Sequence, residues 1–305
     1  MLLLQQFVNS IMLGSVYVTV AVAFTLTIGI LNFLNFTIPT LFMIAGMMGW
    51  ALSYYGLPLG LSGPLPWPIA LTGAVVLTII ASLIVERFTF RYLKTKYGDS
   101  TEHAIPLVSS LGFLLVLENL VRIGYGTDSR RFEGPDADLT MNIGGIFVRV
   151  PQLVSLAVTV VIVLGLTMMI KHSRIGRGLR AIAENPDAAN ILGVDTRRIV
   201  PVVFILTGLL CGLAGALFAI NYGEVSPAMG EDIGTKAIAG MVIGGLGSIW
   251  GAVLGGLIVG LIEMMTVHFF GADTVQVMVW GALLLTLLAY PSGLLGHNTI
   301  GKGKL

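Results

Sequence analysis

Long apolar runs separated by short polar segments dominate the chain and predict membrane-spanning helices. No charged residue occurs before Glu86, and the first apolar run, 7–30, exceeds the about 20 residues that a helix needs to cross a bilayer. Further apolar runs end at basic residues or turn-forming segments, at 40–54, 69–85, 105–122, 151–170, 199–222, 250–269 and 274–290. The pattern predicts an all-α fold, a polytopic transmembrane helical bundle of about eight spans that forms one domain, 1–305.

Polar residues and a proline interrupt the pattern between the first two apolar runs. Asn32 and Asn35 are three residues apart, so on a helix they would share a face. With Thr37 and Pro39 they are candidates for lining a translocation pathway. An unwound segment would also supply polar backbone, which is tolerated at membrane depth only where protein or a water-filled cavity covers it.

Eight glycines crowd the apolar stretch 237–262, and the sequence GGLGS at 244–248 predicts a break. We expect a re-entrant half-helix near 233–249, then a full helix from about Trp250. A phosphate-binding loop would need a following lysine, so helix packing is the better interpretation. Four further pathway candidates lie in this region, namely Gly244, Gly245, Gly247 and Glu263. Glu263 is either a partner for a basic group on another helix or an interfacial residue that reaches water.

Two other segments carry local signals. Glycines at 208, 212 and 215 within the run 199–222 predict close approach of a neighbouring helix. The polar connection 123–150 contains turn signals and the alternating sequence Ile-Phe-Val-Arg-Val, which predicts a small hairpin over the membrane surface.

Composition and charge placement support a membrane protein and give it an orientation. Of 305 residues, 55% are hydrophobic and 11% charged, whereas soluble domains have about a quarter charged. The single cysteine excludes an internal disulfide and a cysteine-based metal site. Four basic residues in 87–96, six in 171–198 and two in the tail (Lys302 and Lys304) make twelve of seventeen. The positive-inside rule then predicts these segments in the cytoplasm, with 123–150 and the N-terminus outside.

The longest polar run between two strongly apolar segments covers residues 171–198. Its centre predicts a short helix, because Asn185 is a good N-cap, Pro186 suits the first helical position and Gly193 suits a left-handed residue after the helix. Arginines at every third position precede it, and a helical turn would gather them on one side; they are Arg174, Arg177 and Arg180. A polar loop with its own capped helix and a row of arginines is typical of a surface that another protein contacts.

The same loop carries a family resemblance. Its sequence RIGRGLRAIAENPDAANILGV resembles the cytoplasmic coupling loop of permeases from ATP-driven (ABC) importers, specifically the branched-chain amino acid permease family. Two further stretches extend the resemblance over nearly the whole chain, GILNFLNFTIPTLFMIAG and AIAGMVIGGLGSIWGAVLGGLIVGLIE. Thr37, Ile38 and Pro39 stand where we expect a small polar residue or His-Gly, so the resemblance leaves the exact substrate open.

The resemblance implies that loop 171–198 docks on an ATP-hydrolysing subunit. The expected coupling residues are Arg177, Arg180, Ala183, Glu184, Asn185, Pro186, Asp187, Ala188, Ala189, Leu192 and Gly193. In a docked complex Glu184 and Asp187 would pair with basic groups of the ATPase. Ala188, Ala189 and Leu192 would fill an apolar groove on its surface.

The resemblance further implies a permease subunit of the bacterial cytoplasmic membrane that imports leucine, isoleucine and valine. Its expected partners are two ABC ATPase subunits, a second similar permease or another copy of itself, and an external substrate-binding protein. We expect no enzymatic activity, no cofactor and no nucleic acid. Related importers for urea, short-chain amides or sugars share the architecture and stay open as alternatives. A secondary transporter would usually place ionisable residues at mid-span, and a membrane-embedded enzyme would need catalytic clusters that do not stand out.

Overall fold

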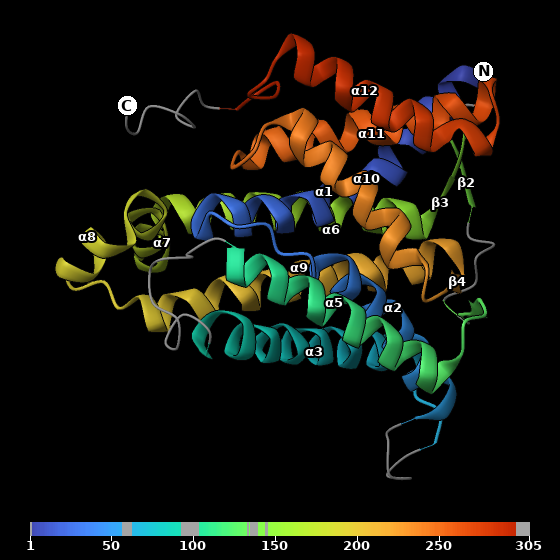
Figure 1. Cartoon of the computed structure of the whole chain (residues 1–305). Helices are drawn as coiled ribbons and strands as arrows, with labels where there is room; N and C mark the ends of the chain where they lie inside the picture. The colour runs from blue at the N-terminus through green and yellow to red at the C-terminus, as the bar shows by residue number, and fades with distance from the viewer. Residues whose placement is uncertain are drawn as a thin grey trace.

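The protein folds into a bundle of long helices that lie side by side (Figure 1). The computed structural model describes residues 2–56, 63–92, 104–132, 134, 140–143 and 146–296. The α-helices of this part are α1 (Leu2–Leu31), α2 (Ile38–Tyr55), α3 (Trp67–Val85), α5 (Ala104–Tyr125), α6 (Val150–His172), α7 (Arg174–Glu184), α8 (Pro186–Ile191), α9 (Thr196–Tyr222), α10 (Met229–Gly244), α11 (Ile249–Phe269) and α12 (Val275–Ala289). A π-helix, η2 (Glu86–Tyr92), continues α3, and a 3₁₀ turn, η4 (Ala272–Thr274), precedes α12.

The predicted all-α membrane architecture is confirmed. Within the described residues, seven helices are long and apolar enough to cross a bilayer. The remaining two long helices are shorter, because α2 has 18 residues and α10 has 16. Both were expected to be short for a full crossing, since Asn32 to Pro39 and the Gly244–Ser248 break limit them.

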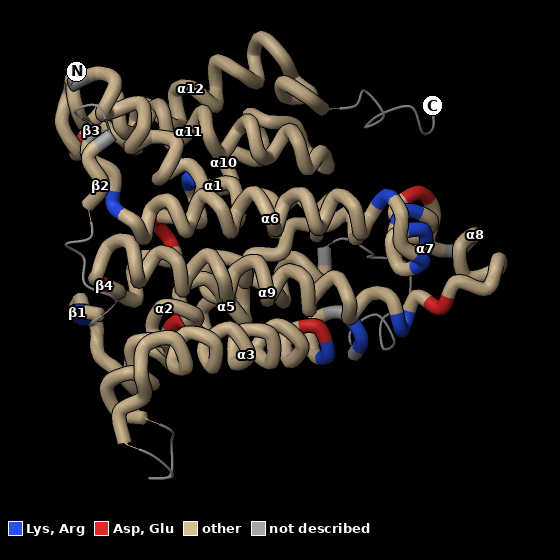
Figure 2. Tube along the Cα trace, turned by 180° about the vertical axis from the view of Figure 1, so that it is seen from behind, with Lys and Arg blue, Asp and Glu red and all other residues tan. Residues whose placement is uncertain are grey.

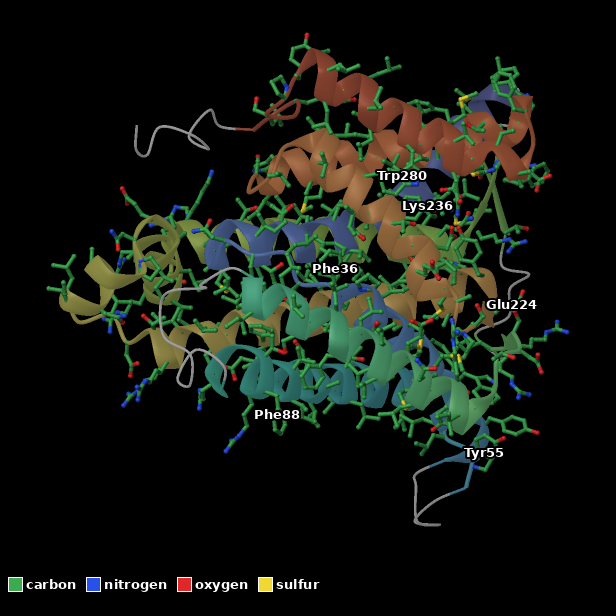
Figure 3. All side chains as sticks on the ribbon, in the orientation of Figure 1. Phe36, Tyr55, Phe88, Glu224, Lys236 and Trp280 are labelled. Carbon is green, nitrogen blue, oxygen red and sulfur yellow. The ribbon has the colours of Figure 1, made fainter. Side chains whose placement is uncertain are left out.

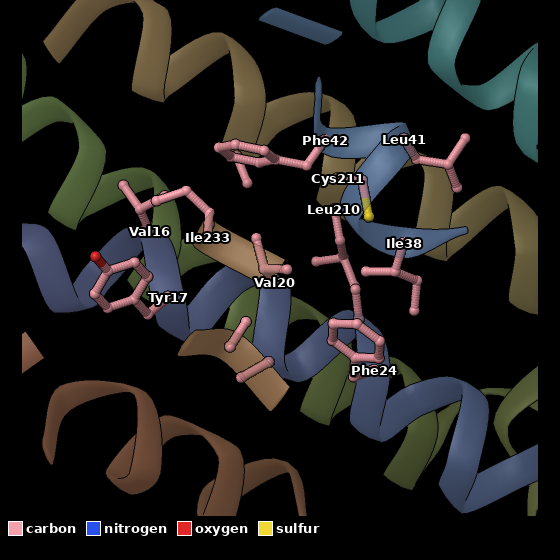
Figure 4. Close-up of a cluster of buried hydrophobic side chains, with 14 of the residues drawn as sticks. Val16, Tyr17, Val20, Phe24, Ile38, Leu41, Phe42, Leu210, Cys211 and Ile233 are labelled. Atoms are coloured by element: carbon pink, nitrogen blue, oxygen red, sulfur yellow. The ribbon is translucent and has the colours of Figure 1, made fainter. Parts of the chain in front are cut away.

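Helices α1 and α9 form the centre of the bundle. In their apolar windows 83% and 67% of the residues are buried, against 11% in α5 and α12. Around them, large side chains from four helices fill the core (Figure 4); they include Tyr17, Val20 and Phe24 of α1, Ile38 and Phe42 of α2, Leu210 and Cys211 of α9, and Ile233 of α10. The peripheral helices turn most of their apolar residues outward, as expected of helices that face lipid.

Short strands gather at one end of the bundle, which we call the hairpin end. The predicted hairpin is present, because β2 (Thr140–Ile143) pairs antiparallel with β3 (Ile146–Arg149). A second pair, β1 (Arg130–Arg131) with β4 (Glu224–Val225), was not predicted from the sequence. This pair joins segments more than 90 residues apart, so it depends on how α5 and α9 end side by side. The N-terminus also lies at the hairpin end (Figure 1).

The opposite end carries α7 and α8, and we call it the loop end. Lysines and arginines gather there on α7 and on the neighbouring ends of other helices (Figure 2). The chain leaves the described region at the same end (Figure 1). Several basic residues used for the predicted orientation lie outside the described residues, namely Lys94, Lys96, Lys302 and Lys304.

The predicted half-helix, break and full helix are present as α10, residues 245–248 and α11. A Cβ added to Gly29 would lie 3.3 Å from Gly247 Cα, so the break lies beside the last turns of α1, near the loop end. A 16-residue helix rises about 24 Å. Helix α10 therefore leads from the hairpin end toward the loop end, and α11 runs back to the hairpin end. The chain does not return within α10 to the end where α10 began.

Close packing at the glycines of α9 is confirmed. A Cβ on Gly208 would lie 2.9 Å from Ile79 Cα of α3, and one on Gly212 would lie 3.2 Å from Val75 Cα of the same helix. At Gly215 the added atom would collide with the carbonyl oxygen of Phe42 in α2. Glycine thus brings α2 and α3 into backbone contact with the central helix.

Candidate functional site

The predicted short helix in the polar loop is α8, and its local chemistry is as expected. Asn185 ends α7 and caps α8, because its Oδ1 accepts a hydrogen bond from Ala188 N at 3.0 Å. Pro186 occupies the first helical position. Gly193 has a φ of 87°, the left-handed conformation that glycine adopts without strain.

Helix α7 holds this loop against the bundle. Ser173 caps it by accepting from Gly176 N at 2.9 Å, and its apolar face is buried while its arginines are exposed. A Cβ on Gly176 would collide with the carbonyl oxygens of Met169 and Ile170, so only glycine lets α7 start so close to α6. Arg180 donates to the carbonyl oxygens of Ile170 and Lys171, the latter at 3.1 Å, and so satisfies the C-terminal end of α6.

The apolar residues that are exposed on and just after α8 are not the same three that were predicted to meet the ATPase. Ala189 is 2% exposed, and its carbonyl oxygen accepts from Val194 N at 2.9 Å. It therefore packs inside the chain and offers no surface to a partner, contrary to expectation. Ile191 and Leu192 are 87% and 81% exposed, and Ala188 is exposed as well. Sequence reasoning missed Ile191, although a large aliphatic residue beside Leu192 was a visible signal.

The pathway candidates near α1 are unwound and do not share a face. Asn32 is exposed and has a φ of 55°, which ends α1. Asn35 is 1% exposed, and its Oδ1 accepts from Thr37 N at 3.0 Å and from Thr37 Oγ1 at 2.7 Å. Its Nδ2 has no hydrogen-bond acceptor among the described residues. The side chain of Asn35 thus replaces the missing helix turn and starts α2.

Pro39 and the glycine candidates lie at helix crossings. A Cβ on Gly234 would lie 2.5 Å from Pro39 Cγ, so α2 and α10 touch there. Pro39 also lines a cleft of about 340 Å³ between α2, α5 and α10. Gly245 has a φ of 116°, and together with Gly244 it packs against neighbouring backbone. Glu263 lies 14 residues after Ile249, roughly 21 Å along α11. The structure therefore does not gather the predicted pathway residues at one place.

Glu263 belongs to a buried ionic cluster that joins three helices. Lys236 Nζ of α10 donates to Glu263 Oε1 at 2.8 Å and to Asp232 Oδ2 at 3.1 Å. Tyr17 of α1 donates through its hydroxyl to Glu263 Oε2 at 2.5 Å. The Lys236 and Glu263 side chains are 9% and 14% exposed, and Figure 3 places Lys236 within the bundle. Of the two expectations for Glu263, a basic partner on another helix is the one found.

Sequence reasoning missed Lys236 and Tyr17. One signal was available, because Lys236 follows Asp232 by four residues and is the only charged residue of the stretch 233–262 before Glu263. A lysine in a helix of glycine and aliphatic residues requires a buried counter-charge. The arrangement contains paired charges and hydrogen bonds between α1, α10 and α11, so it can fix these three helices relative to one another.

Comparison with known proteins places residues 6–288 in the family described as branched-chain amino acid transport system, permease component. The chain is 31% identical to the high-affinity branched-chain amino acid transport permease BraD of Pseudomonas aeruginosa, covering 98% of this chain and 97% of BraD. It is 30% identical to the corresponding permease LivH of Escherichia coli, again over 98% and 97%. The fructose import permease FrcC of Rhizobium meliloti is 34% identical over 43% of this chain and 37% of its own.

Proposed function

Because this chain belongs to the family of permease components of branched-chain amino acid transport systems, we propose that it imports leucine, isoleucine and valine across the bacterial cytoplasmic membrane. The chain is a multi-pass membrane permease and a subunit of an ABC importer complex, and the family is not catalytic. The relatives named for branched-chain amino acids match almost end to end, whereas the fructose permease matches less than half of the chain. This difference in coverage favours an amino acid over a sugar as the substrate.

The complete transporter contains two ATP-hydrolysing subunits, a second permease subunit or another copy of this chain, and an external substrate-binding protein. The loop end faces the cytoplasm, where loop 171–198 contacts an ATPase. Its basic residues agree with this orientation by the positive-inside rule. The external binding protein delivers substrate at the hairpin end.

The observation that carries the coupling role is the exposed apolar pair at the C-terminal end of α8. Ile191 and Leu192 are almost fully exposed at the end of a capped helix, and Arg177, Arg197 and Arg198 of the same loop are exposed as well. Two adjacent aliphatic side chains with this exposure fit an apolar groove on a partner.

Force can pass from α8 into the bundle through short connections. Asn190 Oδ1 of α8 accepts a hydrogen bond from Thr196 Oγ1, at the start of α9, at 2.5 Å. Asp195 caps α9 by accepting from Arg197 N at 3.0 Å. Since α9 is a central helix, a displacement of α8 on ATP binding would move the core as a rigid body and open the pathway alternately to each side.

The test is substitution of Ile191 with glutamate in the reconstituted transporter. A charge where the groove must close should lower leucine uptake and substrate-stimulated ATP hydrolysis together, by about tenfold or more, because desolvating an unpaired carboxylate is costly. The matched control is Ile123→Glu, since Ile123 is 83% exposed on α5 at the other end of the bundle. It should insert and transport normally.

Normal uptake and hydrolysis by Ile191→Glu would contradict the coupling role of α8. Ala189→Glu is a poorer test, because Ala189 is buried within the loop and the variant would disturb the loop's own fold. Uptake of leucine but not of urea or fructose by the unaltered complex would support a branched-chain amino acid as the substrate.

A further inference from the structure

A cleft of about 600 Å³ opens at the hairpin end between the first turns of α1, the hairpin, and the ends of α6, α9 and α11. Its volume lies in the range of small-molecule sites. Part of its wall is polar and comes from four elements; the residues are Gln5, Asn9, Arg149, Gln152, Asn221 and Tyr222. On α1, Met12, Leu13 and Val16 provide a continuous aliphatic wall.

The cleft is held open by hydrogen bonds of the protein itself. Gln5 Oε1 accepts from Phe147 N at 2.9 Å, and Gln5 Nε2 donates to Phe147 O at 2.8 Å. This amide therefore continues the pairing edge of β3 and fixes the hairpin over α1. Gln5 Nε2 also donates to Asn9 Oδ1 at 3.1 Å. A preformed site of this kind needs little ordering when a ligand enters.

Among the described residues that line this cleft, Arg149 is the only one with a charged side chain. No carboxylate of the described part of the chain lies within ion-pair distance of its guanidinium. Glu263, on α11, is paired with Lys236, which it shares with Asp232. A guanidinium presents paired donors that match the two oxygens of a carboxylate. The cleft thus favours an anionic group at the position of Arg149.

Asn221 supplies a complementary acceptor. Its Nδ2 donates to Ser155 Oγ of α6, whereas its Oδ1 is buried and has no hydrogen-bond donor among the described residues. Buried acceptors nearly always have a partner, so the Asn221 oxygen can accept from a donor group of a ligand in the cleft that Asn221 lines. An ammonium group carries three such donors.

We propose that this cleft receives the transported amino acid at the outer end of the permease, before it enters the membrane pathway. Arg149 binds the α-carboxylate, Asn221 Oδ1 accepts from the α-ammonium, and the aliphatic side chain lies against Met12, Leu13 and Val16. The inference rests on the proposed function. It also gives that function a physical basis, since urea and sugars lack the carboxylate that Arg149 would bind.

Binding of radiolabelled leucine to the assembled permease–ATPase complex, without its external binding protein, tests the proposal. The complex is placed in bilayers of phosphatidylcholine alone, so that no anionic lipid competes for Arg149. Arg149→Gln should weaken leucine binding by about tenfold or more, since a charge-assisted contact is lost, and Arg149→Lys should retain part of the affinity. Arg131→Gln is the matched control, because Arg131 is exposed on β1 at the same end and does not line the cleft.

Leucinol, which lacks the carboxylate, separates a lost contact from a damaged fold. The unaltered complex should bind leucinol about tenfold more weakly than leucine, and Arg149→Gln should bind both equally, at the level of leucinol in the unaltered protein.

Equal leucine binding by Arg149→Gln and Arg131→Gln, in a complex that imports leucine, would overturn this inference and leave the proposed function standing. An effect of Arg149→Gln that appears only with phosphatidylglycerol would identify a lipid phosphate as its ligand and would also overturn the inference. Failure of the unaltered complex to import leucine would overturn the proposed function, and the inference with it.

Discussion

At the scale of single residues, the ion pair of Lys236 and Glu263 is the strongest constraint inside the bundle. A charged side chain at the centre of a spanning helix costs about 2.5–3.5 kcal/mol in insertion experiments. Here two such charges lie 2.8 Å apart, and the Tyr17 hydroxyl donates to the second carboxylate oxygen. Because each group neutralises or satisfies another, the cluster fixes α1, α10 and α11 in one arrangement.

Removing one partner of this ion pair should therefore destabilise the protein more than removing both. Lys236→Met leaves a buried carboxylate without its counter-charge and should destabilise the protein by about 3–5 kcal/mol. The double variant Lys236→Met with Glu263→Leu should recover most of this loss. The measurement is the fraction of protein that stays monodisperse after heating in detergent. Arg198→Met is the control, because its pair with Asp195 is 86% and 50% exposed and is worth at most about 1 kcal/mol. Additive losses in the double variant would contradict a coupled buried pair.

The residues that could be predicted are those whose chemistry is local. Asn185, Pro186 and Gly193 specify α8 through bonds and dihedral angles within nine residues, so the sequence alone was sufficient. The partner of Glu263 lies 27 residues away on another helix, and only the packing of α10 on α11 brings it near. The same limit explains Ala189, because which face of α8 is buried depends on where α7 and α9 lie.

At the scale of elements, glycines decide how closely helices pack. A stripe of glycines on α9 predicted a close contact, but the sequence could not say which helices fill it. The structure assigns Gly208 and Gly212 to α3 and Gly215 to α2. Since lipid tails are as apolar as leucine, such contacts in a membrane are stabilised by close van der Waals packing.

Gly215→Leu should force α2 away from α9 and lower the yield of assembled transporter severely. Overpacking a core costs about 1–3 kcal/mol where side chains can adjust, and here the obstacle is the backbone of Phe42, which cannot. Gly165→Leu is the matched control, because no atom lies within 4 Å of a Cβ added there on α6. Yield after size-exclusion chromatography is the measurement. Equal yields for the two variants would show that the α2–α9 contact is not close in the membrane.

At the scale of the whole molecule, the direction of α10 determines the topology. In the described chain, α1, α2, α3, α5, α6, α9, α10, α11 and α12 run alternately between the hairpin end and the loop end (Figure 1). The sequence predicted that α10 is short and followed by a turn, which its glycines specify. Its direction depends on contacts with α1 and α11, such as Gly29 with Gly247, and a hydropathy pattern contains no information on these.

Cysteine labelling in a Cys211→Ala background tests this topology directly. With the hairpin end outside, Glu224→Cys should react with an impermeant thiol reagent in intact cells, because Glu224 is exposed between α9 and α10. Leu246→Cys, at the α10–α11 turn, should be protected in intact cells and react after permeabilisation, since Leu246 is 37% exposed near the loop end. Asn190→Cys on α8 is the control for the cytoplasmic side and should behave like Leu246→Cys. Reaction of Leu246→Cys from outside would show that α10 turns back within the membrane, whereas reaction of Asn190→Cys from outside would invert the whole orientation and remove α8 from the reach of any ATPase.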